Sequence, residues 1–155
     1  MRLKGLNCIV TGGSSGIGAA TVKRFVDEGA QVLIADIDID TANSFAEEMG
    51  SSVGAIKCDV RIESDVKAVS DHAYKTWGKV DVLVNNAGSE LNQTYDKTTL
   101  EEWDRVLDTD LKGPWLMCKY IVPGMVDAGS GSVINISSLN GLCLLYTSPS
   151  PRDRQ

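Results

Sequence analysis

A glycine-rich turn near the amino end restricts the fold more than any other stretch of the sequence. Four strand-compatible residues, 8–11, run into a turn with glycines at positions 12, 13, 16 and 18, and helix-forming residues follow. This order predicts a strand, a tight turn and a helix. Glycines there leave the unpaired N–H groups of the helix open to an anion, and the helix dipole adds partial positive charge. The turn therefore predicts a pyrophosphate site.

The spacing of these glycines departs from the general dinucleotide fingerprint. That fingerprint is Gly-x-Gly-x-x-Gly, whereas this turn reads Gly-x-x-x-Gly-x-Gly. With Thr11 in front, it resembles the Thr-Gly-x-x-x-Gly-Ile-Gly turn of the short-chain dehydrogenase/reductase family. An ordinary connection between a strand and a helix is the alternative interpretation. The resemblance implies that a nicotinamide dinucleotide binds here, in contact with Gly12, Ser14, Ser15, Gly16, Ile17 and Gly18.

An acid ends the second predicted strand. Residues 31–36 form a short apolar run typical of a strand buried on both faces of a parallel sheet, and Asp36 closes it. Such a carboxylate, about 20 residues after the turn, can accept hydrogen bonds from the adenosine ribose and would repel a 2′-phosphate. No Arg or Lys follows closely, and Asp38 and Asp40 add negative charge. The sequence therefore favours NAD over NADP, and a solvated strand-end acid is the alternative.

Two further strand ends match the same family. Residues 52–58 predict a strand followed by Asp59 and Val60, which resemble the family's Asp-Val pair beside the adenine ring. Residues 80–85 predict the fourth strand, followed by Asn86, Ala87 and Gly88. In the family, the asparagines of this segment brace the sheet and the small residues let the adenosine ribose approach. Small residues at a strand end suit close ligand approach, although a plain Asn-rich turn would have the same composition.

Amphipathic segments separate these strands. Apolar spacing predicts helices over residues 19–28, 41–49, 63–77 and 99–127, the last capped by Thr98 or Thr99, and a fifth strand over 131–138. Alternating strands and helices predict an α/β fold, a Rossmann-type doubly wound parallel sheet with strand order 3-2-1-4-5 that is truncated after about five strands.

Two residues are candidates for catalysis by resemblance. Ser138 matches the serine whose hydroxyl binds the substrate oxygen, where it would stabilise developing charge, and Ser137 is the alternative if the register shifts by one. Asp110 stands where the family usually has an asparagine that holds a water in a proton relay. A carboxylate can accept a hydrogen bond from water but cannot donate as an amide does. A polar break in the helix is the structural alternative for Asp110.

The family's Tyr-x-x-x-Lys acid/base pair has no counterpart at the expected spacing. Pro151 and Gln155 occupy the expected positions, Tyr146 comes too early, and no lysine follows Lys119. A tyrosine without a neighbouring lysine keeps a pKa of about 10 and is a poor proton donor near neutral pH.

Composition changes abruptly after Leu142. Two prolines within three residues oppose the helix that should carry the pair, and residues 143–153 back-translate to a sequence that looks like a transposase-type sequencing adapter. We therefore expect an incomplete NAD-binding Rossmann domain over residues 1–142 and a non-native or disordered tail over 143–155. A natural disordered tail is the alternative.

Charge, hydropathy and cysteine content argue against several classes of ligand and location for this protein. Lys and Arg number 15 against 21 Asp and Glu, which argues against nucleic acid and anionic membranes. No apolar run approaches the roughly 20 residues of a membrane-spanning helix, and we expect a cytoplasmic protein without a targeting segment. Four scattered cysteines and the single histidine, His72, predict reduced and mostly buried thiols, a surface or half-buried histidine and no metal site.

Three functions compete. The resemblance implies an oxidoreductase that transfers a hydride between NAD(H) and a secondary alcohol or carbonyl substrate, working as a homo-oligomer whose interface includes the helix around residues 111–126. The alternative is a non-catalytic dinucleotide-binding module, since the Tyr-x-x-x-Lys pair is missing. A plain interaction domain is the third, because one fold hosts many functions.

The fifth strand generates the first prediction. An apolar strand at the edge of a sheet offers unpaired backbone groups to other chains, so the isolated chain should aggregate or dissolve poorly. Size-exclusion chromatography and thermal melting measure this, and a monodisperse monomer that melts cooperatively would contradict it.

Overall fold

The computed structural model describes residues 1–91, 93–94 and 96–138. Strands and helices alternate along this part of the chain, and one π-helical turn, η1, interrupts the last long helix. In chain order the elements are β1 (Asn7–Thr11), α1 (Gly16–Asp27), β2 (Gln31–Asp36), α2 (Ile39–Met49), β3 (Val53–Lys57), α3 (Glu63–Trp77), β4 (Val82–Asn85), α4 (Leu100–Leu107), η1 (Asp108–Lys112), α5 (Gly113–Asp127) and β5 (Ser132–Asn135).

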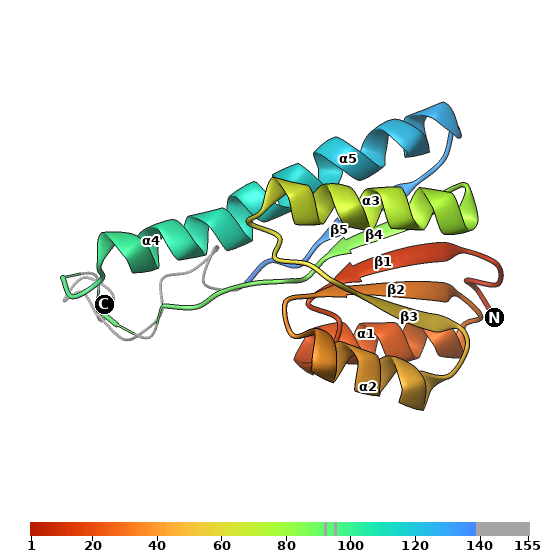
Figure 1. Ribbon diagram of the computed structural model, residues 1–155, viewed down its shortest axis with the longest axis horizontal. Coiled ribbons are helices and arrows are strands. Elements are labelled where there is room, and N and C mark those ends of the chain that lie inside the picture. The colour runs from red at the N-terminus through yellow and green to blue at the C-terminus, as the bar shows by residue number, and fades with distance from the viewer. Residues whose placement is uncertain (92, 95, 139–155) are drawn as a thin grey trace, which may run out of the picture.

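The five strands form one parallel sheet in the order β3-β2-β1-β4-β5. Helices α1 and α2 cover one face, and α3 and α5 cover the other (Figure 1). This three-layer arrangement confirms the predicted doubly wound fold and its strand order. All five strands run in the same direction, so their carboxyl ends meet at one edge of the sheet.

The core has two halves because side chains alternate across a strand. Ile9, Leu33 and Leu83 point into the half that α3 and α5 close, and each is at most 2 % exposed. Their neighbours Val10 and Ile34 point into the half under α1 and α2. The central strands are thus apolar on both faces, as expected for a parallel sheet covered by helices on both sides.

The predicted helix over residues 99–127 is not one regular helix, which corrects that expectation. Thr99 caps α4 through a reciprocal capping box with Glu102, and α4 runs past the end of the sheet without burying any of its residues (Figure 1). The π-helical turn η1 then joins α4 to α5. Periodicity of apolar residues does not reveal such a turn, because Leu107, Leu111 and Trp115 keep a helical spacing of four residues through η1.

Several element boundaries differ from the predicted ones. Helix α1 begins at Gly16 instead of residue 19, and α2 begins after Asp38, whose side chain accepts a hydrogen bond from the Thr41 amide. Strand β5 has four residues instead of eight, all exposed at the edge of the sheet, and it includes Val133 and Ile134. The predicted tail over 143–155, with Cys143 and Tyr146, lies outside the described residues.

No helix within residues 1–138, gaps excepted, combines the length and apolarity needed to span a membrane.

Burial of the central strands yields a stability prediction. Leu83→Ala should lower the free energy of unfolding by about 2–5 kcal/mol, because Leu83 is fully buried and truncation leaves a cavity. The matched control Leu100→Ala, at a side chain that is 82 % exposed, should change it by less than about 0.5 kcal/mol. Urea denaturation followed by circular dichroism measures both, and equal effects would contradict the assigned core.

Candidate functional site at the carboxyl edge of the sheet

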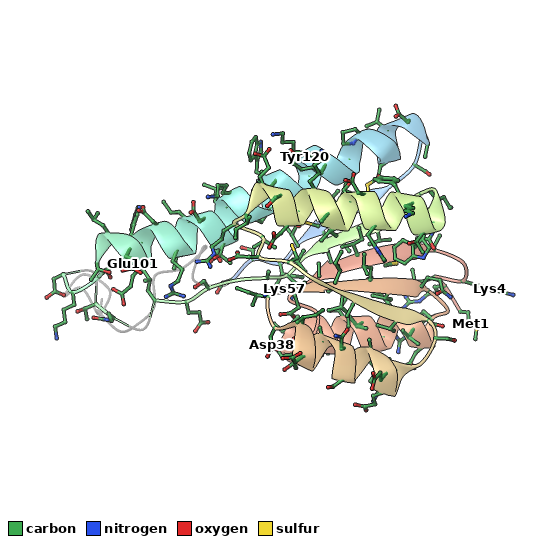
Figure 2. All side chains as sticks on the ribbon, viewed as in Figure 1. Met1, Lys4, Asp38, Lys57, Glu101 and Tyr120 are labelled. Carbon is green, nitrogen blue, oxygen red and sulfur yellow. The ribbon has the colours of Figure 1, made fainter. Side chains whose placement is uncertain are left out.

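The predicted site residues of the first four strands lie at the carboxyl edge of the sheet. Each of these strands brings one predicted group to this edge. They are the turn after β1, Asp36 at the end of β2, Asp59 after β3 and Asn86 after β4. Figure 2 shows Asp38 and Lys57 toward this edge, with Met1 and Lys4 at the opposite end of the molecule. In open α/β sheets, ligands bind outside the carboxyl ends of the strands, at the point where strand order reverses. Here that point lies between β1 and β4.

The glycine-rich turn is closed tightly on one side and open on the other. Gly12 and Gly16 adopt φ values of 61° and 52°, a region that favours glycine. A Cβ at Gly18 would overlap the Gly12 carbonyl oxygen and approach Asn86 Nδ2 within 2.6 Å. A Cβ at Gly16 would meet nothing within 4 Å. The turn is therefore tightly packed where Gly18 meets Gly12. The space above Gly16, on the side to which a Cβ would point, is open to a ligand.

The N-terminus of α1 faces that open space without a side-chain cap. Ser15 at the N-cap makes no capping hydrogen bond, and the first turn contains no acidic residue. By contrast, Asp38 caps α2 and Thr99 caps α4. Ser15, Gly16 and Ile17 are all exposed. The first amides of α1 therefore offer donors and partial positive charge to an anion, and no acidic residue within that helical turn competes for them.

Thr11 and Asn86 fasten the turn to the neighbouring strand. The Asn86 side-chain amide donates to the carbonyl oxygens of Thr11 at 3.0 Å and Gly12 at 2.9 Å. The Thr11 hydroxyl accepts from the amides of Asn86 and Ala87, both at 3.0 Å. Next to them, Asn85 Nδ2 donates to Asn135 Oδ1 at 2.8 Å and links β4 to β5. The asparagines thus brace the sheet, as the resemblance implies.

Asp36 contacts the turn directly. Its carboxylate is buried, and Oδ2 accepts from the Ser14 amide at 3.0 Å while Oδ1 accepts from the Asp38 amide at 3.1 Å. The residue predicted to bind ribose therefore also holds the turn against the end of β2. A carboxylate has about four acceptor positions, so two remain for hydroxyl donors.

Asp59 and Val60 lie just beyond β3. A fork of hydrogen bonds from Arg61 surrounds the Asp59 carboxylate and lowers its pKa below the usual range. The Val60 side chain is buried against Gly113 at the start of α5, where a Cβ would come within 2.8 Å of it. Val60 can therefore meet a ligand only through its backbone.

The turn η1 brings Asp110 next to the end of β4. Asp110 Oδ1 accepts from the Ser89 amide at 2.8 Å, and a Cβ on Gly88 would lie 3.7 Å from the same oxygen. Arg105 hydrogen-bonds the Ser89 side chain and donates to the Glu90 carbonyl at 3.2 Å. Asp110 thus holds the segment after β4, which is more than the polar break considered from the sequence.

Ser138 comes three residues after the end of β5 and is exposed, as is the alternative, Ser137. The positions expected for the tyrosine and lysine lie outside the described residues.

Sequence reasoning missed two functional contributions at this edge. The Thr11 hydroxyl makes three hydrogen bonds, because it also donates to the Val84 carbonyl at 3.4 Å. The threonine directly before the glycines was the sequence signal for this role. Arg61 follows the Asp-Val pair directly and could have been weighed as a partner for Asp59. The π turn around Asp110 had no sequence signal of this kind.

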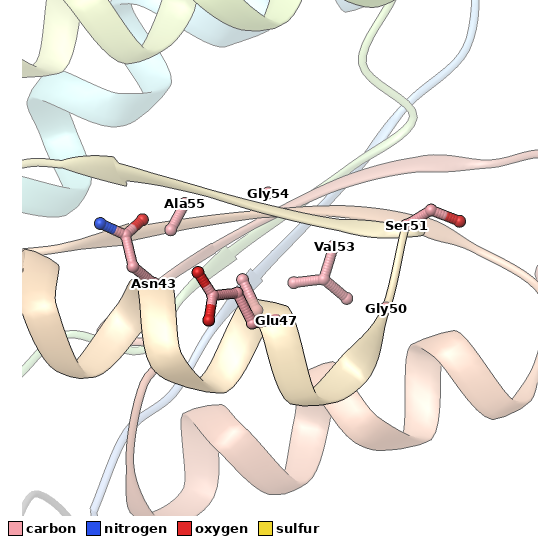
Figure 3. A pocket seen from close by; sticks show the side chains of 8 residues that line it. Asn43, Glu47, Gly50, Ser51, Val53, Gly54 and Ala55 are labelled. Atoms are coloured by element: carbon pink, nitrogen blue, oxygen red, sulfur yellow. The ribbon is translucent and has the colours of Figure 1, made fainter.

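Two hollows of the described surface lie away from this edge. A groove of about 450 Å³ lies between α2 and β3 and is lined by Asn43, Glu47 and Ser51 among others. Figure 3 shows these side chains. The groove lies toward the amino end of β3, where such sheets do not bind nucleotides. An apolar hollow of about 300 Å³ lies between α5 and β5.

The thiols and the histidine agree with expectation within the described residues. Cys8, Cys58 and Cys118 are free, and burial raises the pKa of Cys8 and Cys58 to about 12, so both stay protonated. His72 is exposed on α3. No group of three or more metal-binding side chains occurs in this part of the chain.

The fold and this edge together define a dinucleotide-binding domain of the Rossmann type. The sequence matches the short chain dehydrogenase family over residues 7–149, and the chain belongs to that family. Members of this family use NAD or NADP.

Curated relatives carry different names. The chain is 40% identical to momilactone A synthase of Oryza sativa subsp. japonica, over 90% of this chain and 52% of the relative. It is 35% identical to a 3-oxoacyl-(acyl-carrier-protein) reductase of Thermotoga maritima, over 92% and 59%. It is 39% identical to a 3-alpha-(or 20-beta)-hydroxysteroid dehydrogenase of Mycobacterium tuberculosis, over 91% and 54%. The chain therefore spans about half the length of these relatives.

The closed side of the turn yields a prediction. Gly18→Ala should destabilise the fold by about 1–3 kcal/mol, because the new methyl group collides with backbone that cannot yield cheaply. Gly54→Ala is the control, since its Cβ would meet only Leu33 at 3.8 Å. Urea midpoints of the two variants decide the matter, and an unaffected Gly18→Ala protein would show that the turn is packed differently.

Proposed function

We propose that this domain binds NAD(H) through its adenosine diphosphate half. The observation that carries the proposal is the uncapped N-terminus of α1 beside the open space above Gly16. The first amides of α1, over residues 16–18, would hold the pyrophosphate, and Ser14 would contribute only its side chain because its amide donates to Asp36. Asp36 would accept from the ribose hydroxyls, and Asp59 and Val60 would border the adenine. Asn86, Ala87 and Gly88 would let the adenosine ribose approach the end of β4.

NAD is preferred over NADP in this proposal. Asp36 would bind the ribose, and Asp38 adds a second carboxylate two residues later. The segment 37–40 between β2 and the first turn of α2 contains no Arg or Lys that could neutralise a 2′-phosphate. A phosphate there would face uncompensated negative charge, which costs binding free energy.

For the whole protein we propose hydride transfer between NAD(H) and a secondary alcohol or carbonyl compound. The nicotinamide supplies the hydride chemistry when bound. Ser138 would donate a hydrogen bond to the substrate oxygen, and Asp110 would hold the segment after β4 and accept from a water. The names of the relatives differ in their substrates, so the compound is left at the level of its class.

A second candidate is a non-catalytic dinucleotide-binding module. The absence of a lysine after Lys119 favours it for this 155-residue chain, since the acid/base pair of the family needs one. Both candidates predict NADH binding, and turnover of alcohols by a longer version separates them. An interaction domain without a ligand would leave NADH fluorescence unchanged.

The longest helical segment supports association with a second copy. Leu107, Leu111 and Trp115 repeat every four residues across η1, and each is at least 41 % exposed. Contiguous apolar side chains on a surface mark interaction sites. We propose that this stripe contributes to a homo-oligomer of the whole protein.

Cofactor preference gives the next prediction. The chain should bind NADH at least tenfold more tightly than NADPH, and Asp36→Ala should weaken NADH binding about tenfold or more, because a charge-assisted hydrogen bond contributes about 1.5–3 kcal/mol. Asp71→Ala, at an exposed acid in the middle of α3, is the control and should leave both affinities unchanged. Calorimetry measures the affinities. Equal binding of both cofactors would refute the preference, and absence of binding would refute the proposed function.

A further inference from the structure

Asp110 places a negative charge beside the segment that follows β4. Its Oδ1 accepts from the Ser89 amide at 2.8 Å, and a Cβ on Gly88 would lie 3.7 Å from the same oxygen. The residue lies in the middle of η1 and is exposed, so this hydrogen bond fixes the place of its charge. An asparagine could accept the same hydrogen bond without bringing a charge to this position.

No cation pairs with this carboxylate in the part of the chain that the structure describes. The ion pairs there include none with Asp110, although Asp108 and Lys112 pair at 2.8 Å in the same turn. Arg105, one helical turn earlier, hydrogen-bonds the Ser89 side chain instead. The charge of Asp110 therefore acts on whatever ligand occupies the space over the end of β4.

The order of the strands indicates which half of the proposed cofactor faces Asp110. Asp36 at the end of β2 would bind the adenosine ribose, and the N-terminus of α1 would hold the pyrophosphate. A dinucleotide that crosses the switch point between β1 and β4 continues with its second nucleotide toward β5. The Ile136 amide donates to the Asn85 carbonyl at 2.9 Å, so the segments after β4 and β5 leave the sheet side by side. Asp110, beside the first segment, and Ser138, in the second, would therefore flank the nicotinamide half.

The two redox states of the cofactor differ in charge at this half alone. The nicotinamide ring of NAD⁺ carries a formal positive charge, whereas the dihydronicotinamide ring of NADH is neutral. The adenosine, the pyrophosphate and the second ribose are the same in both. A nearby carboxylate therefore attracts the ring of the oxidised form and has no such attraction for the ring of the reduced form.

We propose that Asp110 is a specificity-determining residue that biases this site toward NAD⁺ over NADH. The inference rests on the proposed function, and it assigns the preference for one redox state of the cofactor to the charge at residue 110. The glycine-rich turn, α1 and Asp36 contribute equally to both forms, because they would contact only the part of the molecule that the two forms share.

Exchange of Asp110 for asparagine removes the charge and keeps both the size of the side chain and its acceptor for the Ser89 amide. Calorimetry on the whole chain at low salt should show that Asp110→Asn weakens NAD⁺ binding about three- to tenfold and changes NADH binding less than about twofold. Asp108→Asn is the matched control on the same turn, because Lys112 already pairs with that carboxylate. This control should change the ratio of the two affinities by less than about twofold.

One further variant and one further condition keep the test decisive if Asp110→Asn does not fold. Asp110→Glu keeps the charge and should keep the wild-type ratio of NAD⁺ to NADH affinity. Salt screens the charge of an exposed carboxylate, so raising the ionic strength from about 0.01 M to about 1 M should shift the wild-type ratio toward NADH.

The outcomes separate this inference from the proposed function. A ratio that neither the asparagine substitution nor salt changes would overturn the role of Asp110, and so would equal weakening of NAD⁺ and NADH by Asp110→Asn. Both of these results leave cofactor binding intact. If the wild-type chain binds neither NAD⁺ nor NADH, the proposed function fails and this inference fails with it.

Discussion

The contact between the start of α1 and the end of β1 is the constraint on which the rest of the edge depends. Gly18 lies against the Gly12 carbonyl so closely that no side chain fits between them. This contact sets where the first amides of α1 point, and Thr11 and Asn86 then fasten the same turn to β4. One close backbone approach therefore aligns a helix dipole, two strand ends and an open space above Gly16.

Much of this arrangement could be predicted from the sequence because it follows from local patterns. Apolar runs of four to six residues, broken by amphipathic segments, indicate a parallel sheet covered on both faces, and the glycines mark the turn. The acids and asparagines after the strands could be placed at one edge because parallel strands all end there. These features depend on residues that are neighbours in the sequence.

The rest depends on contacts between distant segments, which local patterns do not encode. Asp36 was predicted as an acceptor for a sugar, but its bonds to the Ser14 and Asp38 amides appear only when β2 lies beside the turn. Asp110 was predicted from a family position, and its bond to the Ser89 amide depends on how η1 meets β4. The hydrogen bonds between Arg61 and Asp59 could have been predicted from the sequence, since only one residue separates the two.

The π-helical turn between α4 and α5 has a consequence for how this protein can change over time. Each residue rotates an α-helix by about 100°, so removing one residue from Asp108–Lys112 would turn everything on one side of the deletion to a different face. The Asp110 carboxylate could then not keep its hydrogen bond to the Ser89 amide while α5 keeps the same face buried against the sheet. The length of this segment is therefore more tightly constrained than its composition, and insertions or deletions there should be rarer than substitutions.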